Sequence, residues 1–191
     1  MPPRSGAKWL RSAACRLRRI GLGLLVVGLC GSAGRAPSEY EVKAAFLYNF
    51  AKFVEWPAAS FKGDTTPFVL GIVGEDPFGS TLSALVEREQ VKGRPVEIRR
   101  YHEGEDFAGC HLLFISRSEA ARLSQLLPLA EKHSVLTVSE HPDFLSQGGM
   151  INFALVKQSV RFDINKKATT QAGLKISSKL LAVARAVLDD Q

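Results

Sequence analysis

Cysteine is scarce in this chain of 191 residues, which contains only three. Two of them, Cys15 and Cys30, lie within the first 36 residues, so Cys110 is the single cysteine of the remainder. One cysteine cannot form an internal disulfide, and the sequence has no CxxC motif and no histidine–cysteine cluster with metal-ligand spacing. The sequence therefore predicts neither a disulfide framework nor a metal site. Because Cys110 precedes an apolar run, we expect a small buried side chain there, with an intermolecular disulfide as the alternative.

Long apolar runs are also missing, which argues against a transmembrane helix. The main run, at residues 20–29, has 10 residues, whereas a membrane span needs about 20. Six basic residues and no acidic one precede this run, and small residues follow it, which is the layout of a secretory signal peptide. We therefore predict that residues 1–36 are a cleavable signal peptide, its cleavage point left open, and that residues 37–191 form one mature domain. An uncleaved N-terminal anchor is the alternative.

An excess of one charge is present only in the predicted signal peptide. The whole chain has 25 basic and 19 acidic residues, a formal net charge of +6. Seven of the basic residues and none of the acidic ones precede Pro37, so residues 37–191 carry 18 basic and 19 acidic residues, a net charge of −1. Nucleic-acid-binding proteins usually present a basic patch or stripe. The balanced charge therefore argues against nucleic acid as a partner.

Aromatic residues, by contrast, are abundant at the start of the mature domain, in YEVKAAFLYNFAKFVEWP at residues 40–57. Ser38 and Glu41 have the spacing of a capping box, and Pro57 disfavours helical geometry at the residue before it, so an amphipathic helix is predicted between them. We expect its apolar side to pack on the core. That side consists of Val42, Ala45, Phe46, Asn49, Phe50, Phe53 and Val54.

Short apolar runs bounded by turn residues predict buried strands at residues 67–73, 112–115 and 135–138. An alternating run predicts a half-buried strand at residues 96–100. Helices are predicted between these strands, the first of them capped by Asp76. Strand–helix–strand therefore occurs twice, which indicates parallel strands joined by crossovers.

The pattern changes after residue 150. Residues 150–156 and 160–164 read as two strands around a short turn, which predicts a hairpin. A long helix is predicted over residues 166–188, and its apolar stripe is wide enough for a partner or a second copy to cover part of it. The predicted fold is a single α/β domain with a mixed, mostly parallel sheet and flanking helices. It would have a Rossmann-like three-layer arrangement and end in the C-terminal hairpin and the long helix.

No recognisable catalytic motif is present. Gly71, Gly74 and Gly79 surround a strand-to-helix turn but lack the GxGxxG spacing, and Glu75 and Asp76 at this turn would repel a phosphate. The four histidines are scattered along the sequence. We therefore predict that the protein is not an enzyme and needs no cofactor.

Some polar residues interrupt apolar patterns or flank the predicted hairpin strands. A buried amide costs roughly 1–3 kcal/mol unless it is hydrogen-bonded, so such residues are candidates for a polar network or for orienting a ligand. Structural hydrogen bonds to the backbone are the alternative. These candidates are Asn49, Asn152, Arg161 and Asn165.

Several blocks, in order, resemble the YfiR/HmsC-type periplasmic regulators: YEVKAAFLYNFAKFVEWP, GIVGEDPFG, VLTVSE, GGMINF, VRFDIN and AGLKISSKLL. The resemblance spans residues 40–187. It implies a periplasmic homodimer that binds the periplasmic sensor domain of a membrane-bound diguanylate cyclase and holds it inactive. Lower cyclic di-GMP and less biofilm would follow, and an outer-membrane-associated or periplasmic regulator would sequester the repressor. Some members use cysteine pairs for redox control, which Cys110 alone cannot supply.

The segments that would contact the partner are the aromatic helix end, the turn after the first strand and the start of the hairpin. Core packing is the alternative for each of them. An alternative function is a periplasmic small-molecule-binding module that relays a solute signal to a membrane receptor, with its site near Glu75 and Asn49. The predicted partner contacts are Phe53, Trp56, Glu75, Asp76, Phe78, Gly149, Met150, Ile151 and Phe153.

Overall fold

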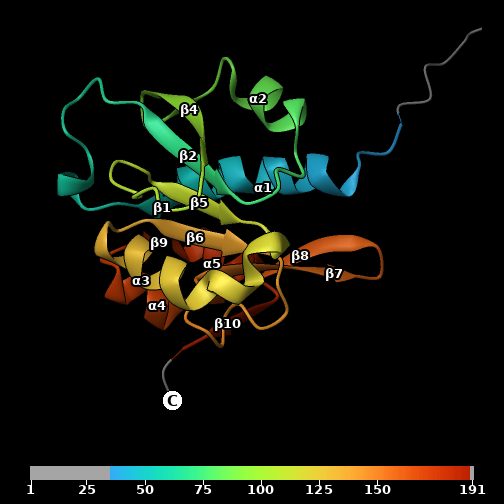
Figure 1. The fold of residues 1–191 in the computed structure, drawn as a ribbon. Coiled ribbons are helices and arrows are strands. Elements are labelled where there is room, and N and C mark those ends of the chain that lie inside the picture. Colours follow the sequence, from blue (N-terminus) through green and yellow to red (C-terminus); the bar gives the residue numbers. More distant parts are fainter. Residues whose placement is uncertain (1–34, 190–191) are drawn as a thin grey trace, which may run out of the picture. The chain divides into compact units, whose positions relative to one another are not determined.

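The structure, a computed structural model, describes residues 35–189, and the fold is formed by the unit Ala36–Gln191 (Figure 1). The predicted signal peptide therefore lies outside the described residues, apart from its last two. None of the described helices is long and apolar enough to cross a membrane. In chain order the elements are α1 (Glu39–Phe53), β1 (Val54–Glu55), η1 (Ala58–Ser60), β2 (Phe68–Val73), α2 (Ser80–Val86), β3 (Gln90–Val91), β4 (Arg94–Tyr101), β5 (Leu112–Ile115), η2 (Arg117–Arg122), α3 (Leu123–Lys132), β6 (Leu136–Ser139), β7 (Ile151–Val156), β8 (Ser159–Asn165), α4 (Lys166–Gln171), β9 (Lys175–Ile176), α5 (Ser178–Val183) and β10 (Ala186–Leu188).

Eight of these strands form one sheet with the order β10-β8-β7-β6-β5-β2-β4-β3. Strands β4, β2, β5, β6 and β7 are adjacent in this order and run parallel to one another, as the strand–helix–strand pattern predicts. The predicted hairpin is the antiparallel pair β7–β8, and β10 joins the edge parallel to β8. Lys157 and Gln158 close the hairpin in the left-handed region, at φ 47° and 63°, as a two-residue turn requires. The mixed, mostly parallel α/β fold is confirmed.

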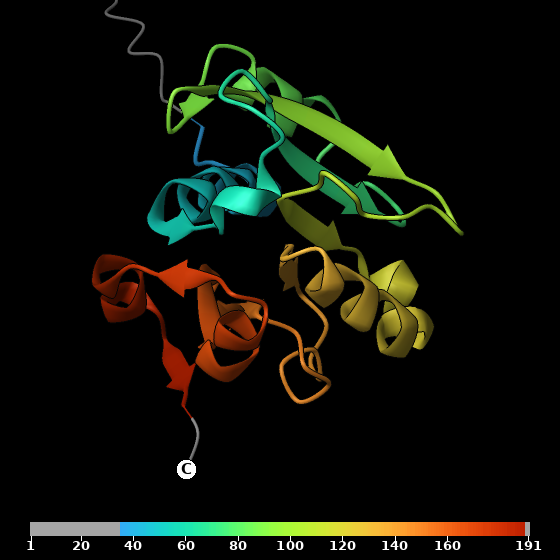
Figure 2. The ribbon, with the colours of Figure 1, turned by 90° about the vertical axis from the view of Figure 1, so that its left-hand side faces the viewer.

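The sheet is covered on both faces. In β5, Leu112 and Phe114 point into one hydrophobic cluster, while Leu113 and Ile115 point into another. Helices α1, α2 and α5 supply the first cluster and α3 supplies the second, which explains why β5 reads as a continuous apolar run. Figure 2 shows α1 and α3 on opposite sides of the strands. The predicted three layers are present.

Helix α1 begins with the predicted capping box, in which the Ser38 hydroxyl accepts from the Glu41 backbone N–H. Its buried face, however, is turned by about a third of a helical turn from the predicted one. Ala44, Leu47 and Ala51 are buried in the hydrophobic cluster on this side of the sheet. The aromatic stripe flanks this face, and Asn49 is exposed. The prediction that Asn49 lies on the core side is therefore wrong.

The predicted long C-terminal helix is also wrong. It is divided into α4, β9, α5 and β10. Gly173 ends α4 with a φ of +75°, in the left-handed region that favours glycine. Ser177 then starts α5 anew, since its side chain accepts from the Leu180 backbone N–H. The apolar residues that suggested one stripe are therefore distributed over four short elements.

The helix predicted to start at Asp76 begins later, at Ser80. Asp76 does accept backbone hydrogen bonds, from Phe78 and Gly79 at 2.8 and 3.2 Å, but these close the turn before α2. The predicted cap is therefore a turn-forming residue, and its interaction is local in either case.

A buried histidine organises the opposite end of the sheet. His111 precedes β5 and is fully buried between the rings of Phe61 and Phe68, at centroid distances of 4.4 and 5.1 Å. Its Nδ1 accepts from the Val69 backbone N–H at 3.0 Å, so Nε2 carries the proton and donates to the Ser60 carbonyl at 3.2 Å. Burial lowers the pKa of His111 to about 4. The ring is therefore neutral at pH 7.

This pKa shift predicts a loss of stability in mild acid. The unfolded chain, with a histidine pKa of 6.5, binds more protons than the folded chain between pH 6.5 and 4. The stabilisation is fully present above pH 6.5 and decreases as the pH falls through this window, by up to about 3 kcal/mol. Urea unfolding at pH 7 and pH 4.5 measures it. The free energy of unfolding of His111→Gln should change less between the two pH values than that of the native chain. The control His102→Gln, at an exposed position, should show the same change as the native chain. Equal changes in all three proteins would contradict the assignment.

Candidate functional site

The candidate site lies at the carboxyl edge of the parallel strands. The chain passes from β2 to β4 on one side and later to β5 on the other, and such a switch point opens a crevice at this edge. Gly74, Ser116 and Glu140 follow directly after β2, β5 and β6. Because Ser139 of β6 pairs with Asn152 of β7, the β7–β8 hairpin starts at this edge and extends beyond it (Figure 1).

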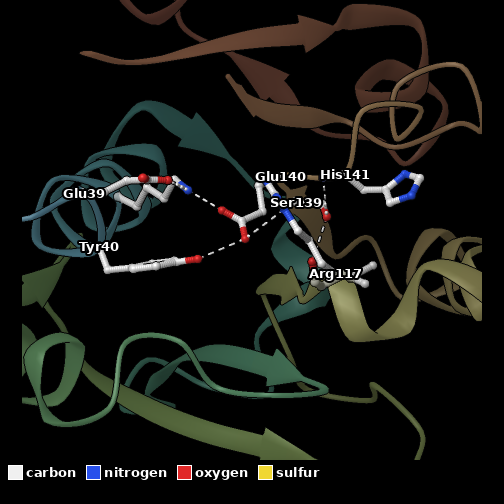
Figure 3. Close-up of polar contacts among 8 residues, drawn as sticks. Glu39, Tyr40, Arg117, Ser139, Glu140 and His141 are labelled. Carbon is white, nitrogen blue, oxygen red and sulfur yellow. Dashed lines mark hydrogen bonds and ion pairs between the residues drawn. The ribbon is translucent and has the colours of Figure 1, made fainter. Parts of the chain in front are cut away.

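A charged network fastens the start of α1 to this edge (Figure 3). The Glu140 carboxylate forms an ion pair with Lys43, accepts from the Tyr40 hydroxyl at 3.1 Å, and lies 3.3 Å from Arg117 Nε. Lys43 also forms an ion pair with Glu39, one turn earlier in α1. The network has two cations and two anions, so its formal charge is balanced.

The network is largely removed from water. The side chains of Lys43 and Glu140 are only 4% and 6% exposed. Burial, followed by the charge of Glu140, raises the pKa of Tyr40, so its hydroxyl remains a donor. Removing one member of a buried ion pair typically costs 3–5 kcal/mol, because the other charge is left unpaired. This network therefore fixes the start of α1 to the residues that follow β5 and β6.

A row of buried polar side chains crosses three adjacent strands beside this network. Ser139, Asn152 and Asp163 lie opposite one another in the register of β6, β7 and β8. The Ser139 hydroxyl donates to the Ile115 carbonyl at 2.7 Å. Asp163 accepts from Nε and Nη2 of Arg185, the first at 2.7 Å. Between these satisfied groups, Asn152 Oδ1 has no hydrogen-bond partner among the described residues.

This polar row borders a cleft of about 380 Å³ at the base of the hairpin. Arg117 and Arg185 are the accessible charges, with side chains 65% and 48% exposed, whereas Glu140 and Asp163 are 6% and 10% exposed. A molecule in the cleft would therefore meet guanidinium groups that buried carboxylates hold in place. The lining residues are Arg117, Glu140, Pro142, Leu145, Asn152, Phe153, Ala154, Leu155, Asp163 and Arg185.

The predicted partner contacts do not form one surface. Phe53 and Trp56 lie at the opposite end of α1, where the Trp56 indole N–H donates to the His111 carbonyl at 2.9 Å. Phe53 is partly exposed. Phe78 is buried against Tyr40 and Phe114, with ring centroids 5.7 and 4.8 Å away. Four more of the predicted contacts are also buried in this conformation, namely Gly149, Met150, Ile151 and Phe153.

Of the predicted turn contacts, only Glu75 borders a different hollow. Glu75 is exposed, and Asp76 forms an ion pair with Arg100, whose Nε and Nη2 both donate to Asp76 Oδ2, at 2.9 and 2.6 Å. That hollow is lined by Glu75 but by neither Asn49 nor Asn152. The structure therefore does not bring the predicted ligand site at Glu75 and Asn49 into one pocket.

The other predicted polar residues have separate positions. Asn165 caps α4, because its side chain accepts from the Ala168 backbone N–H at 3.0 Å, and it also donates to the Leu145 carbonyl. Arg161 is exposed on β8. Of the four candidates, only Asn152 lines the cleft.

Cys110 is buried, as the apolar run after it predicts. Burial raises the pKa of its thiol to about 12, so the reactive thiolate is disfavoured. An intermolecular disulfide stays a prediction that would require this part of the fold to open.

Sequence reasoning missed three members of the site: Glu140, Arg117 and Arg185. A usable signal exists for the first two, because each closely follows a predicted buried strand of the parallel sheet, where ligand-binding side chains gather. Arg185 has no such signal. Its position depends on the end of α4 at Gly173, which the apolar periodicity of the segment does not reveal.

Comparisons with known proteins agree with this fold. None of the curated proteins matches the chain. A crystal structure described as a conserved domain protein from Vibrio cholerae is similar with a TM-score of 0.51 and 13% sequence identity, over 79% of this chain and 60% of that one. This likeness concerns the fold alone, and the chain covers less than two thirds of that protein. Residues 40–185 match the family described as YfiR/HmsC-like. The chain therefore belongs to the YfiR/HmsC-like family.

Proposed function

We propose that this protein is a periplasmic repressor that binds the periplasmic sensor domain of a membrane-bound diguanylate cyclase and holds it inactive. The observation that carries the proposal is the family match over residues 40–185, which spans nearly the whole described fold. In this proposal residues 1–36 are removed on export, the mature chain acts as a homodimer, and a second envelope regulator releases the cyclase by sequestering the repressor.

Repression of this kind couples the binding of the repressor to a conformational equilibrium of the cyclase. The cyclase exchanges between inactive and active states, and a partner shifts the exchange only by its difference in affinity for them. The repressor needs no bond-making groups, but it needs a surface that fits the inactive sensor domain. Cyclic di-GMP and biofilm formation then fall.

The outer part of the β7–β8 hairpin is the contact surface that we propose. Residues 153–156 and 159–162 pair only with each other, because β6 ends its pairing at Asn152 and β10 pairs with β8 only at 163–165. A two-stranded ribbon is only marginally stable in water by itself, and here α1 supports one face through contacts of Phe46 and Phe50 with Phe153 and Phe162. Leu155 on this ribbon is 58% exposed, and among the four exposed large hydrophobic residues of the described part only Val183, at 64%, is more exposed. A partner that covers it would bury apolar area and order the ribbon.

A groove beside the hairpin fits an apolar side chain of the sensor domain. It has a volume of about 540 Å³ and lies between the start of α1 and the hairpin. Val42 and Phe46 of α1 form one wall, and Leu155 and Val160 form the other. Phe46 is fixed there by ring contacts with Phe162, at a centroid distance of 5.3 Å. The groove is therefore preformed, which lowers the entropic cost of binding.

Deleting the gene should raise cyclic di-GMP, because the cyclase is no longer held in its inactive state. The measurement is mass spectrometry of cyclic di-GMP, with biofilm mass as a second readout, in a strain that expresses the partner cyclase. Returning the full chain should restore the low level. Unchanged cyclic di-GMP after deletion would contradict the proposed function.

Leu155→Asp should weaken binding to the purified sensor domain by about tenfold or more, because a carboxylate would be buried in an apolar contact. Biolayer interferometry measures it. Val183→Asp is the matched control, since Val183 is 64% exposed but lies on α5. Phe53→Asp tests the helix end that the sequence suggests. Loss of binding with Phe53→Asp but not with Leu155→Asp would move the contact surface to that end, and equal loss with Val183→Asp would exclude a hairpin-specific contact.

A further inference from the structure

Asn152 is a polar residue in the cleft that the fold itself does not use. It is only 8% exposed, and its Oδ1 has no hydrogen-bond partner among residues 35–189. A buried polar atom left in this way costs roughly 1–3 kcal/mol. Its neighbours in the row, Ser139 and Asp163, are both hydrogen-bonded. The sheet thus retains an amide that lowers its stability, and the amide lies in the lining of a cleft.

The two arginines around Asn152 use only part of their guanidinium N–H groups in contacts with buried carboxylates. Arg185 donates Nε and Nη2 to Asp163, and Arg117 directs Nε to Glu140. Within the part of the chain that the structure describes, no partner is recorded for the other guanidinium N–H groups of the two arginines. Free guanidinium donors bind a carboxylate well, with charge-assisted hydrogen bonds.

The carboxylates, in contrast, are already occupied. Both oxygens of Asp163 accept from Arg185, and both oxygens of Glu140 are held by the network with Lys43, Tyr40 and Arg117. An ammonium group on a ligand would therefore find no free partner charge. The vacant acceptor is the neutral Asn152 Oδ1, which is enclosed in this conformation. A rotation of the amide toward the cleft would present it to a neutral donor such as a hydroxyl group.

From these groups we infer that the cleft binds a small carboxylic acid that carries a hydroxyl group. Arg117 and Arg185 bind its carboxylate, and Asn152 accepts from its hydroxyl. Pro142, Leu145 and Ala154 contact its carbon chain. The volume of about 380 Å³ is within the usual range for small-molecule sites, about 300–1,000 Å³. This site does not depend on the proposed repression of a cyclase, because binding is measured on the isolated protein.

The test uses pairs of acids that differ only in the hydroxyl group: L-malate against succinate, and L-lactate against propionate. Isothermal titration calorimetry of the purified chain should show binding of the hydroxy acids, each about tenfold tighter than its partner without the hydroxyl, which is the value of one such hydrogen bond. If none of the four acids binds, or if the members of each pair bind equally, the proposal is overturned.

Asn152→Leu separates a ligand-binding amide from a structural one. Without ligand its melting temperature should equal or exceed that of the native chain, because an unsatisfied polar group is replaced by an apolar one of similar size. The preference for hydroxy acids should disappear. A lower melting temperature together with an unchanged preference would show that the amide is structural and would overturn the assignment.

Arg117→Gln should weaken the binding of both members of each pair by about tenfold, because it removes a charge that both carboxylates use. The variant is expected to fold, since Glu140 keeps Lys43 and Tyr40 as partners. Arg161→Gln is the matched control, because Arg161 is exposed on the neighbouring β8 and does not line the cleft. Equal effects of the two substitutions would mean that only the overall charge matters, and this also overturns the site.

Discussion

The ion pair between Lys43 and Glu140 determines where α1 lies on the sheet, and the candidate site depends on that position. Both side chains are almost completely buried, and each has a second partner of opposite charge, Glu39 and Arg117. Such a pair adds little net stability compared with an apolar contact, but leaving one member unpaired is expensive. The chain therefore has one acceptable arrangement at this edge, in which the first turn of α1 meets the end of β6. Everything assembled around that junction, from Arg117 to the base of the hairpin, takes its position from it.

The other end of α1 is fixed by different chemistry. Trp56 donates to the His111 carbonyl, while the His111 ring holds the segment around Ser60 by a hydrogen bond and by stacking. Between the two ends, Phe50 packs on Phe153 and Phe162 at centroid distances of 5.7 and 4.9 Å. The helix is thus held at both ends and along its length. The tip of the hairpin beyond Phe153 and Phe162 has no strand neighbours and carries the exposed Leu155. This part of the surface suits completion by a partner.

Much of the fold could be predicted because its signals are local. Buried parallel strands read as continuous apolar runs, the capping box specifies the start of α1, and alternation specifies the hairpin. Signals failed where two local patterns were equally consistent with the sequence. The apolar surface of α1 is wide enough for two faces, and the choice of the face that contains Ala44 and Ala51 is a tertiary effect. The C-terminal segment has helical periodicity, yet Gly173 and the pairing of Arg185 with Asp163 divide it. The site was harder still, since Glu140, Arg117 and Arg185 are distant in sequence and meet only through the strand order.

The cleft and the groove share one wall, because Leu155 borders both. Their other walls lie on opposite faces of the hairpin: Phe46 and α1 on one side, Asn152, Asp163 and Arg185 on the other. A molecule bound in the cleft would restrict the hairpin, and a sensor domain in the groove would restrict the same residues. Ordering that one ligand has already imposed need not be imposed again by the second, so the two binding free energies would be coupled. Linkage then requires the effect to be reciprocal: whatever factor the small acid contributes to partner affinity, the partner contributes to affinity for the acid. The unsatisfied amide of Asn152 has a physical explanation in this geometry, because a group that lowers the stability of the isolated chain can make the hairpin responsive to what fills the cleft.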